Sequence, residues 1–198
     1  MNKELNKYDA NFTAGGLLFN EFKSLELMLK DDNFLLMIQE EERNNQVIGI
    51  ATMSARKRII AEVKRRSSLA PAGFWNYFFN WSETEMKIGL LFLCLKTYPL
   101  VLDLHLEVAL KKFKTGKTLN AYDIQMRLDE ISSKDTFVAS WSKSTLEKIN
   151  VQYRKAIKDA SLFDGNNLTK PVGTSSSFWK YFEDINETWF LAACFIKN

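Results

Sequence analysis

The chain has 198 residues and a formal net charge of +3, with 46% hydrophobic and 13% aromatic residues. This composition supplies a substantial core and argues against intrinsic disorder. The polar start of the chain carries no secretory signal, and the longest apolar run, residues 88–95, is far too short to cross a bilayer. We therefore expect a cytoplasmic protein with no membrane partner, in which Cys94 and Cys194 are buried thiols.

Turn-forming residues are scarce, with only eight Gly and three Pro. This scarcity predicts helices joined by short loops, and we expect an all-α fold, a compact bundle of about eight to ten helices. We treat residues 1–198 as a single helical domain. Within it, residues 1–70 are a candidate N-terminal subdomain, residues 71–165 the helical core and residues 166–198 a tail.

The first third of the chain is predominantly acidic. Residues 1–12 read as a mobile or extended lead, and residues 17–29 predict an amphipathic helix. The preceding Gly15-Gly16 favours close backbone packing over a phosphate site. A second helix, 33–44, ends in three glutamates. Residues 1–53 contain nine acidic and five basic residues, so these acids either fold back on the basic helix that follows or face a partner protein.

The stretch Ser54–Arg66 contains six basic residues and one acid, which focuses positive charge on one segment. Its helical spacing places Ile59, Ile60 and Val63 on one arc, with Ser54 as the expected N-cap. The opposite arc carries the cations Lys57, Arg58, Lys64 and Arg65.

Two further arginines of this stretch need separate interpretations. Arg56 falls on the apolar arc, which favours a structural role over a nucleic-acid contact, so we expect it to be buried or half-buried and paired with an acid from residues 40–42. Arg66 lies at the border of the two arcs, where either a structural or a nucleic-acid role fits. Helix 33–44, a short link and the basic helix together form the outline of a helix-turn-helix.

The middle of the chain predicts the core. The aromatic cluster at residues 74–81 has no interleaved cations, which favours a core plug over a base-stacking platform. Ser82 and Glu85 form a capping box, and the helix they open, residues 83–97, is apolar enough to be the central buried helix. Pro99 begins the next helix, 99–114, which ends in a small lysine cluster where cations are favoured anyway.

No catalytic or metal constellation is visible. The single histidine, His105, has no nucleophile or carboxylate at a recognisable spacing, so we expect a surface or hydrogen-bonded core residue. The two cysteines do not have metal-ligand spacing. We therefore expect no enzymatic activity, no cofactor and no metal.

A second basic helix, residues 142–160, follows a helix at 119–131 and a polar break, which gives a second helix-turn-helix outline. Hydroxyl residues crowd its start, where free N–H groups suit a phosphate. Its candidate DNA contacts are Lys143, Lys148, Arg154 and Lys155. The tail then predicts a loop at 166–177, a short helix at 178–184 and a final apolar segment, 189–196, that is a helix or a strand.

Three stretches carry a family resemblance: Thr13–Glu21 (TAGGLLFNE), Lys96–Asp103 (KTYPLVLD) and Trp141–Lys148 (WSKSTLEK). In this order and spacing they resemble the BrxA proteins of bacterial BREX phage-defence systems. The resemblance implies an all-helical shape similar to the antitermination factor NusB, binding to double-stranded DNA, other BREX proteins as partners and no known catalysis. The chain departs from the family pattern at residues 160–163, Ala-Ser-Leu-Phe, where Ala-Gly-Leu-Leu is expected.

Two hypotheses follow from the residues and the resemblance together. The first is a non-catalytic protein that binds duplex DNA, mainly through phosphates, using the cations Lys57, Arg58, Lys64, Arg65, Arg66, Lys143, Lys148, Arg154 and Lys155. The alternative is an interaction subunit of a defence complex that does not touch DNA. The acidic segment 1–53 and the aromatic cluster at residues 74–81 favour this alternative.

Overall fold

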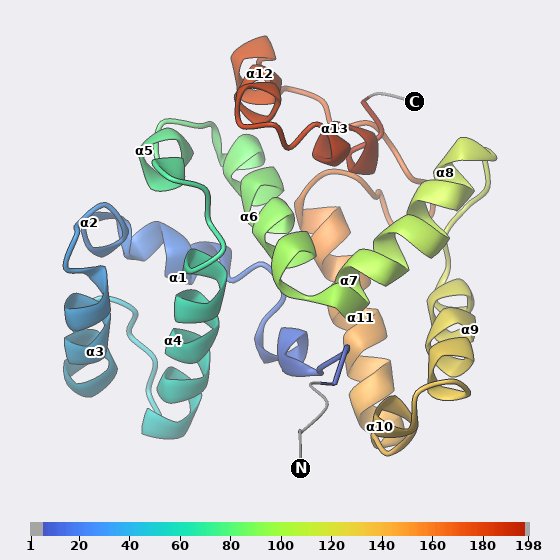
Figure 1. The fold of residues 1–198 in the computed structure, drawn as a ribbon, viewed down its shortest axis with the longest axis horizontal. Coiled ribbons are helices and arrows are strands. Elements are labelled where there is room, and N and C mark those ends of the chain that lie inside the picture. Colours follow the sequence, from blue (N-terminus) through green and yellow to red (C-terminus); the bar gives the residue numbers. More distant parts are fainter. Residues whose placement is uncertain (1–5, 197–198) are drawn as a thin grey trace.

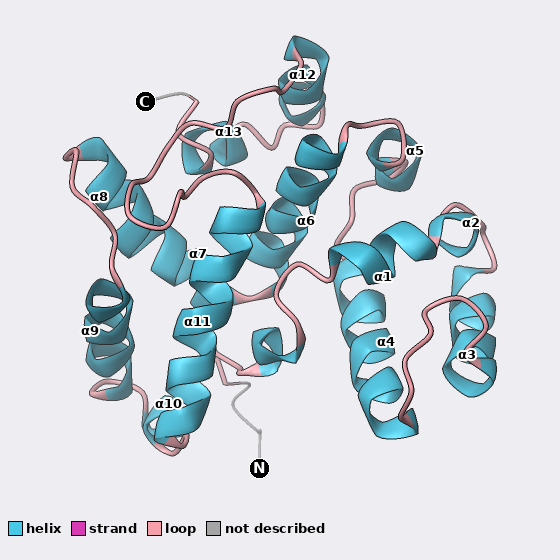
Figure 2. Ribbon diagram, turned by 180° about the vertical axis from the view of Figure 1, so that it is seen from behind, coloured by secondary structure: helices cyan, strands magenta, loops and turns pink. Residues whose placement is uncertain are grey.

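The computed structural model describes residues 6–196, and within that range every regular element is helical (Figures 1 and 2). The all-α prediction is therefore confirmed. The first half contains η1 (Asn11–Ala14), α1 (Phe19–Ser24), α2 (Glu26–Leu29), α3 (Phe34–Asn44), α4 (Met53–Ser67), α5 (Phe74–Phe78) and α6 (Glu83–Thr97). The second half contains α7 (Pro99–Leu104), η2 (His105–Leu110), α8 (Lys111–Lys114), α9 (Ala121–Ser132), α10 (Thr136–Ala139), α11 (Lys143–Asp159), α12 (Ser176–Asp184) and α13 (Trp189–Ala193).

Helix α6 occupies the middle of the molecule, as its sequence predicts (Figure 1). Both halves of its capping box are present, since the Ser82 hydroxyl accepts the Glu85 N–H and the Glu85 carboxylate accepts the Ser82 N–H. The same carboxylate also accepts two bonds from Ser175, the residue that caps α12. All side chains from Ile88 to Leu95 are buried, so α6 is the central core helix.

Aromatic rings from α5, α6, α12 and α13 pack together around one end of α6. Trp81 contacts Phe74, Phe178 and Tyr181 edge-on, and Phe92 contacts Phe190 in the same way. The cluster at 74–81 is therefore a core plug, as predicted. The apolar segment at 189–196 contributes α13, which decides between the helix and the strand left open by its sequence.

The helix predicted at 99–114 is irregular. It begins at Pro99 as α7, changes to a π-helix over η2 and returns to α-geometry in α8. Similarly, the helix predicted at 17–29 divides at Leu25 into α1 and α2. Divisions of this kind give more helical segments than the eight to ten predicted. Among residues 6–196 no single helix is long and apolar enough to cross a membrane; only α6 with Pro99–Lys114, bent by 109°, reaches that length and composition together.

The start of the chain is part of the core in its described portion, which corrects the expectation of a mobile or extended lead over residues 1–12. Residues 1–5 lie outside the described range. Tyr8 and Phe12 are buried, and η1 brings the segment between α4 and α11 (Figures 1 and 2). The sequence does not predict this burial, because two aromatic residues among polar ones give no helical or strand periodicity.

Two helix pairs position the basic residues. Helices α3 and α4 pack side by side and are joined by residues 45–52, while α9 packs on α11 and on the short α10 between them (Figure 2). Asn120 caps α9 through a capping box with Asp123. The helix-turn-helix interpretation of either pair stays a prediction. Ser161, at the position where the resemblance led us to expect Gly, adopts a left-handed φ of 61°, a conformation that favours glycine.

Candidate nucleic-acid interface

The outer face of α4 carries the cations predicted for it. The helix begins at Met53 with Thr52 as N-cap, because the Thr52 hydroxyl accepts the Ala55 N–H; the expected cap at Ser54 is therefore wrong. Lys57, Arg58 and Arg65 are exposed and Lys64 is half-buried. Helical spacing thus separated the solvent-facing arc of this helix correctly from its core-facing arc.

Arg56 is buried, as predicted, but its partners are different from those expected. Its guanidinium donates to the backbone carbonyl oxygens of Glu42, at 2.6 Å, and Ile50, at 3.1 Å. The buried Glu41 carboxylate instead accepts N–H bonds from residues 46–48, the start of the link between α3 and α4. One acid of α3, Glu41, therefore organises the link, and carbonyl oxygens of α3 and of the link accept the hydrogen bonds of the arginine.

Arg66 is a core residue, and its inclusion among the candidate DNA contacts is corrected. Its side chain is fully buried and donates to the Tyr98 hydroxyl at 2.9 Å and to the Leu17 carbonyl at 3.0 Å. The Tyr98 hydroxyl in turn donates to the buried Glu62 carboxylate. Burial raises the pKa of that tyrosine, so it remains a neutral donor. Arg66 thus ties α4 to α6 and to the segment before α1.

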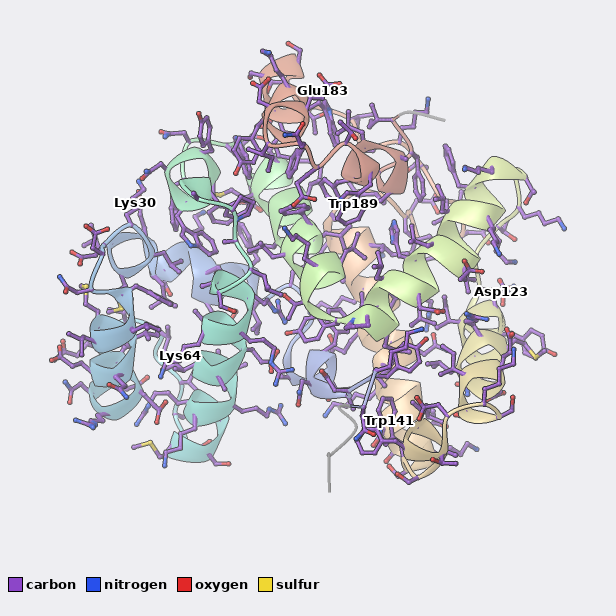
Figure 3. The ribbon with its side chains drawn as sticks, in the orientation of Figure 1. Lys30, Lys64, Asp123, Trp141, Glu183 and Trp189 are labelled. Carbon is purple, nitrogen blue, oxygen red and sulfur yellow. The ribbon has the colours of Figure 1, made fainter. Side chains whose placement is uncertain are left out.

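Two of the four surface cations of α4 already face acids. Lys64 lies on the flank toward α3 (Figure 3), with its Nζ 4.0 Å from a Glu42 carboxylate oxygen. Arg65 donates to Asp9 at 3.1 Å. Within residues 6–196, Lys57 and Arg58 have no carboxylate within ion-pair distance, and Arg58 only reaches the Ala14 carbonyl at 3.5 Å. The charge available to a polyanion on α4 is therefore smaller than the residue count indicates.

Helix α11 offers its cations more openly. Ser142 caps the helix by accepting the Thr145 N–H. Lys148 and Lys155 are exposed and have no ion-pair partner among the described residues. Lys143 is also exposed, with a Glu147 oxygen 3.9 Å away, whereas Arg154 is half-buried and donates to the Asn150 side chain.

The two basic helices meet the same short segment of chain, residues 14–16. From α4, Arg58 reaches the Ala14 carbonyl. From α11, Gln152 packs so closely on Gly16 that an added Cβ would lie 3.0 Å from its Oε1. Lys148 and Lys155 are four residues before and three after Gln152, which places them on the same flank of α11. Arg58, Lys148 and Lys155 therefore border one surface on either side of residues 14–16.

The comparison with protein families decides what kind of chain this is. The BrxA family model matches residues 6–178. The chain belongs to the BrxA family. This membership points to a component of a bacterial BREX phage-defence system, as the three sequence stretches implied.

One solved structure is similar to this BrxA-family chain over nearly its whole length. It is the crystal structure of an uncharacterized protein from Magnetospirillum magneticum, with a TM-score of 0.74 and 18% identity, covering 95% of this chain and 98% of that chain. The likeness shows the fold. A search of curated proteins finds no match.

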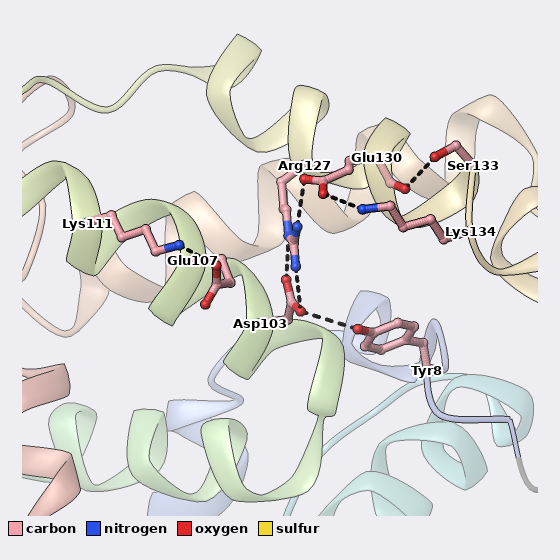
Figure 4. A network of polar contacts seen from close by, with 8 residues as sticks. All are labelled: Tyr8, Asp103, Glu107, Lys111, Arg127, Glu130, Ser133 and Lys134. Carbon is pink, nitrogen blue, oxygen red and sulfur yellow. Dashed lines mark hydrogen bonds and ion pairs between the residues drawn. The ribbon is translucent and has the colours of Figure 1, made fainter.

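A polar network fixes the other flank of the BrxA-family chain and was missed from sequence (Figure 4). The Arg127 guanidinium of α9 holds the Asp103 carboxylate of α7 through bonds of 2.7 and 2.9 Å. Tyr8 donates to the same carboxylate, and Arg127 also donates to Glu130. The pKa of Glu130 is lowered to about 2 by its bonds to Lys134 and Arg127. These residues join α7, α9 and the start of the chain, and no local sequence pattern connects them.

The remaining candidate groups are engaged in the core. His105 is fully buried; its Nε2–H donates to the Ala193 carbonyl at 2.8 Å, and Nδ1 accepts from Tyr153 at 3.1 Å. This is the hydrogen-bonded core histidine predicted as one of two options. Cys94 and Cys194 are buried and free, and burial raises the pKa of both thiols. Among the described residues, no three His, Cys, Asp or Glu side chains form a metal-binding group.

Proposed function

We propose that this BrxA-family chain is a non-catalytic component of a BREX system that binds double-stranded DNA through phosphate contacts. The observation that carries the proposal is the meeting of the two basic helices at residues 14–16. Exposed cations from α4 and α11 border one surface there, although they are about 90 residues apart in sequence. A duplex presents phosphates at regular intervals, so cations from two helices can bind it together.

The proposed contacts are a revised subset of the sequence candidates. Arg58, Lys148 and Lys155 form the centre, because they border residues 14–16, are exposed and have no carboxylate partner within residues 6–196. Lys57 is also exposed and has no such partner, and it lies seven residues before Lys64 on the same face of α4, at the edge toward α3. The partly engaged neighbours of these cations assist from the edges, namely Lys64, Arg65, Lys143 and Arg154. Arg66 takes no part because it is buried.

Binding of this kind depends on charge more than on base identity. With four to six phosphate contacts, the logarithm of the affinity falls with the logarithm of salt concentration with a slope of roughly −4 to −5. The affinity expected at physiological salt is on the order of micromolar. Such an affinity suits a cytoplasmic subunit that acts with other BREX proteins. A non-catalytic role is consistent with His105, whose two ring nitrogens are already occupied.

The test is a gel shift with two unrelated duplexes at two salt concentrations. The fourfold variant Lys57→Glu, Arg58→Glu, Lys148→Glu and Lys155→Glu should no longer shift the mobility of either duplex. The matched control carries the same charge change at exposed lysines elsewhere, in the variant Lys114→Glu, Lys117→Glu, Lys170→Glu and Lys180→Glu. Equal loss in both variants would show that only net charge matters. Undiminished binding by the first variant would refute the proposed interface.

A further inference from the structure

The outer side of α2 and α3 exposes large apolar side chains at high density. Leu27 of α2 is 82% exposed, and Leu35 and Leu36 at the start of α3 are 65% and 62% exposed. Within residues 6–196, the only other exposed leucine is Leu69. Scattered exposed leucines need no explanation, but three within ten residues on two packed helices indicate a binding surface.

This exposure is a consequence of how α3 packs. Ile38 and Glu41 are its fully buried positions. Leu36 lies two residues before Ile38, on the opposite side of the helix. Figure 1 shows α3 at the outer edge of the molecule, with α4 between it and η1. Leu36 therefore faces away from the proposed DNA interface, and no described segment of this chain covers any of the three leucines.

The surroundings of these leucines are acidic. Residues 26–43 contain six acidic and two basic residues. Glu41 is turned inward onto the link and Glu42 faces Lys64, so only part of this charge folds back. Asp32 and Glu40 are exposed and make no ion pair within the described chain. The sequence left open whether these acids fold back on the basic helix or face a partner. Some of them contact α4 or the link between α3 and α4, and others face solvent.

We propose that this surface, Leu27, Leu35 and Leu36 with Asp32 and Glu40, docks a cationic amphipathic helix of a partner protein. An apolar stripe on such a helix covers the leucines, and flanking lysines or arginines face the acids. The negative charge repels duplex DNA. It also disfavours a second copy bound through the same surface, since like charges would then face each other. The charge of the surface therefore selects a basic protein segment.

The test uses synthetic peptides of about 18 residues, or five helical turns, composed of Leu, Lys and Ala. One peptide places its leucines on a single helical face, and its isomer has the same composition with the leucines dispersed. Fluorescence anisotropy with the full chain should show the first peptide bound about tenfold more tightly than the isomer. The variant Leu27→Ser, Leu35→Ser and Leu36→Ser should lose about tenfold in affinity for the first peptide.

Two controls separate this surface from general stickiness and from charge alone. The variant Tyr122→Ser, Met126→Ser and Val172→Ser removes exposed apolar groups elsewhere and should bind the peptide like the wild type. The variant Asp32→Asn with Glu40→Gln should lose about threefold and show a weaker salt dependence.

Three outcomes would overturn the proposal. They are equal binding of both peptides, undiminished binding by the leucine variant, and a wild-type dimer in light scattering that the leucine variant converts to monomer. The last would identify a second copy as the occupant. Because this surface is separate from the cations of α4 and α11, the leucine variant should shift duplex DNA like the wild type. The two proposals can therefore fail independently.

Discussion

Helices α4 and α11 have similar basic sequences but use their cations differently. On α4, Arg56 and Arg66 are buried against carbonyl oxygens, and Lys64 and Arg65 face acids. On α11, the buried face is neutral, with Tyr153 and Asn150, and the lysines point to solvent. A local excess of basic residues therefore includes two kinds of cation: those that are buried or paired within the fold, and those that are free to bind a ligand. Helix α4 has the larger excess of positive charge, but a smaller fraction of its cations is exposed and unpaired than on α11.

The largest expected effect comes from removing a cation that α4 uses for folding. Arg66→Met deletes the buried donor to the Leu17 carbonyl and the Tyr98 hydroxyl, and it removes the positive charge from the buried network that contains Tyr98 and the Glu62 carboxylate. We expect a loss of about 3–5 kcal/mol in the free energy of unfolding, measured by urea denaturation.

The matched substitution on α11 is Lys155→Met, at an exposed position. It should change the free energy of unfolding by less than about 0.5 kcal/mol. If Arg66→Met instead unfolds like the wild type and loses DNA binding, the two helices are equivalent and the comparison fails.

Helical periodicity predicted the parts of this fold that depend on one segment at a time. The Ser82 and Glu85 capping box, the buried run of α6 and the two arcs of α4 all follow from spacing within about four turns. Local spacing succeeds there because a helix repeats every 3.6 residues, and the residues that share a face are fixed by the sequence.

Partners far apart in the sequence were not predictable in the same way. Periodicity showed that Arg56 is buried, but not that carbonyls of Glu42 and Ile50 would satisfy it. Arg66 sat at a border of two arcs, and its burial depends on Leu17 and Tyr98, which belong to other segments. The meeting of α4 and α11 at residues 14–16 is also tertiary. The sequence therefore predicted which cations could bind DNA, but not which of them border one surface in the folded chain.

The inner faces of the two helices predict a difference in pH response. Burial lowers the pKa of His105, which Tyr153 of α11 contacts, to about 4 from an ordinary value near 6.5. The unfolded chain then binds more protons than the folded chain between these values, so stability falls as pH decreases through that window. From pH 7 to pH 5 we expect a loss of about 2 kcal/mol from this residue. Arg66, the fully buried arginine of α4, has a raised pKa and stays charged throughout.

The measurement is urea denaturation at pH 7, 6 and 5 for wild type and His105→Gln, because glutamine is neutral at every pH and still donates and accepts hydrogen bonds. The variant should show a flatter decline, and carboxylate titration contributes to both proteins alike. Parallel declines would mean that His105 does not carry the difference.

A smaller effect separates the outer faces. Lys148→Ala with Lys155→Ala removes two unpaired cations, whereas Lys64→Ala with Arg65→Ala removes two that already face Glu42 and Asp9. We expect duplex DNA affinity to fall about tenfold for the α11 pair and about threefold for the α4 pair, with the larger change in salt slope for α11. Equal losses, measured by anisotropy with a labelled duplex, would show that the acids do not reduce the availability of the α4 cations.

The smallest effect has the opposite sign and isolates one acid. Asp9→Asn removes the nearer of two acidic charges that face Arg65, the other being the Glu62 carboxylate at 3.8 Å, while the asparagine side-chain oxygen can still accept the Asn11 N–H that Asp9 accepts now. Since exposed ion pairs contribute about 1 kcal/mol or less, the fold should be unaffected. Arg65 then keeps only the longer contact with Glu62 and is more available to a phosphate, so DNA affinity should rise about twofold to threefold and the salt slope should steepen by up to about 0.9. Asp184→Asn is the control, because Asp184 pairs with Lys180 on α12 and the change in net charge is the same. A gain in both variants would reflect net charge, and a gain in neither would place Arg65 outside the interface, leaving α11 as the principal DNA-binding helix.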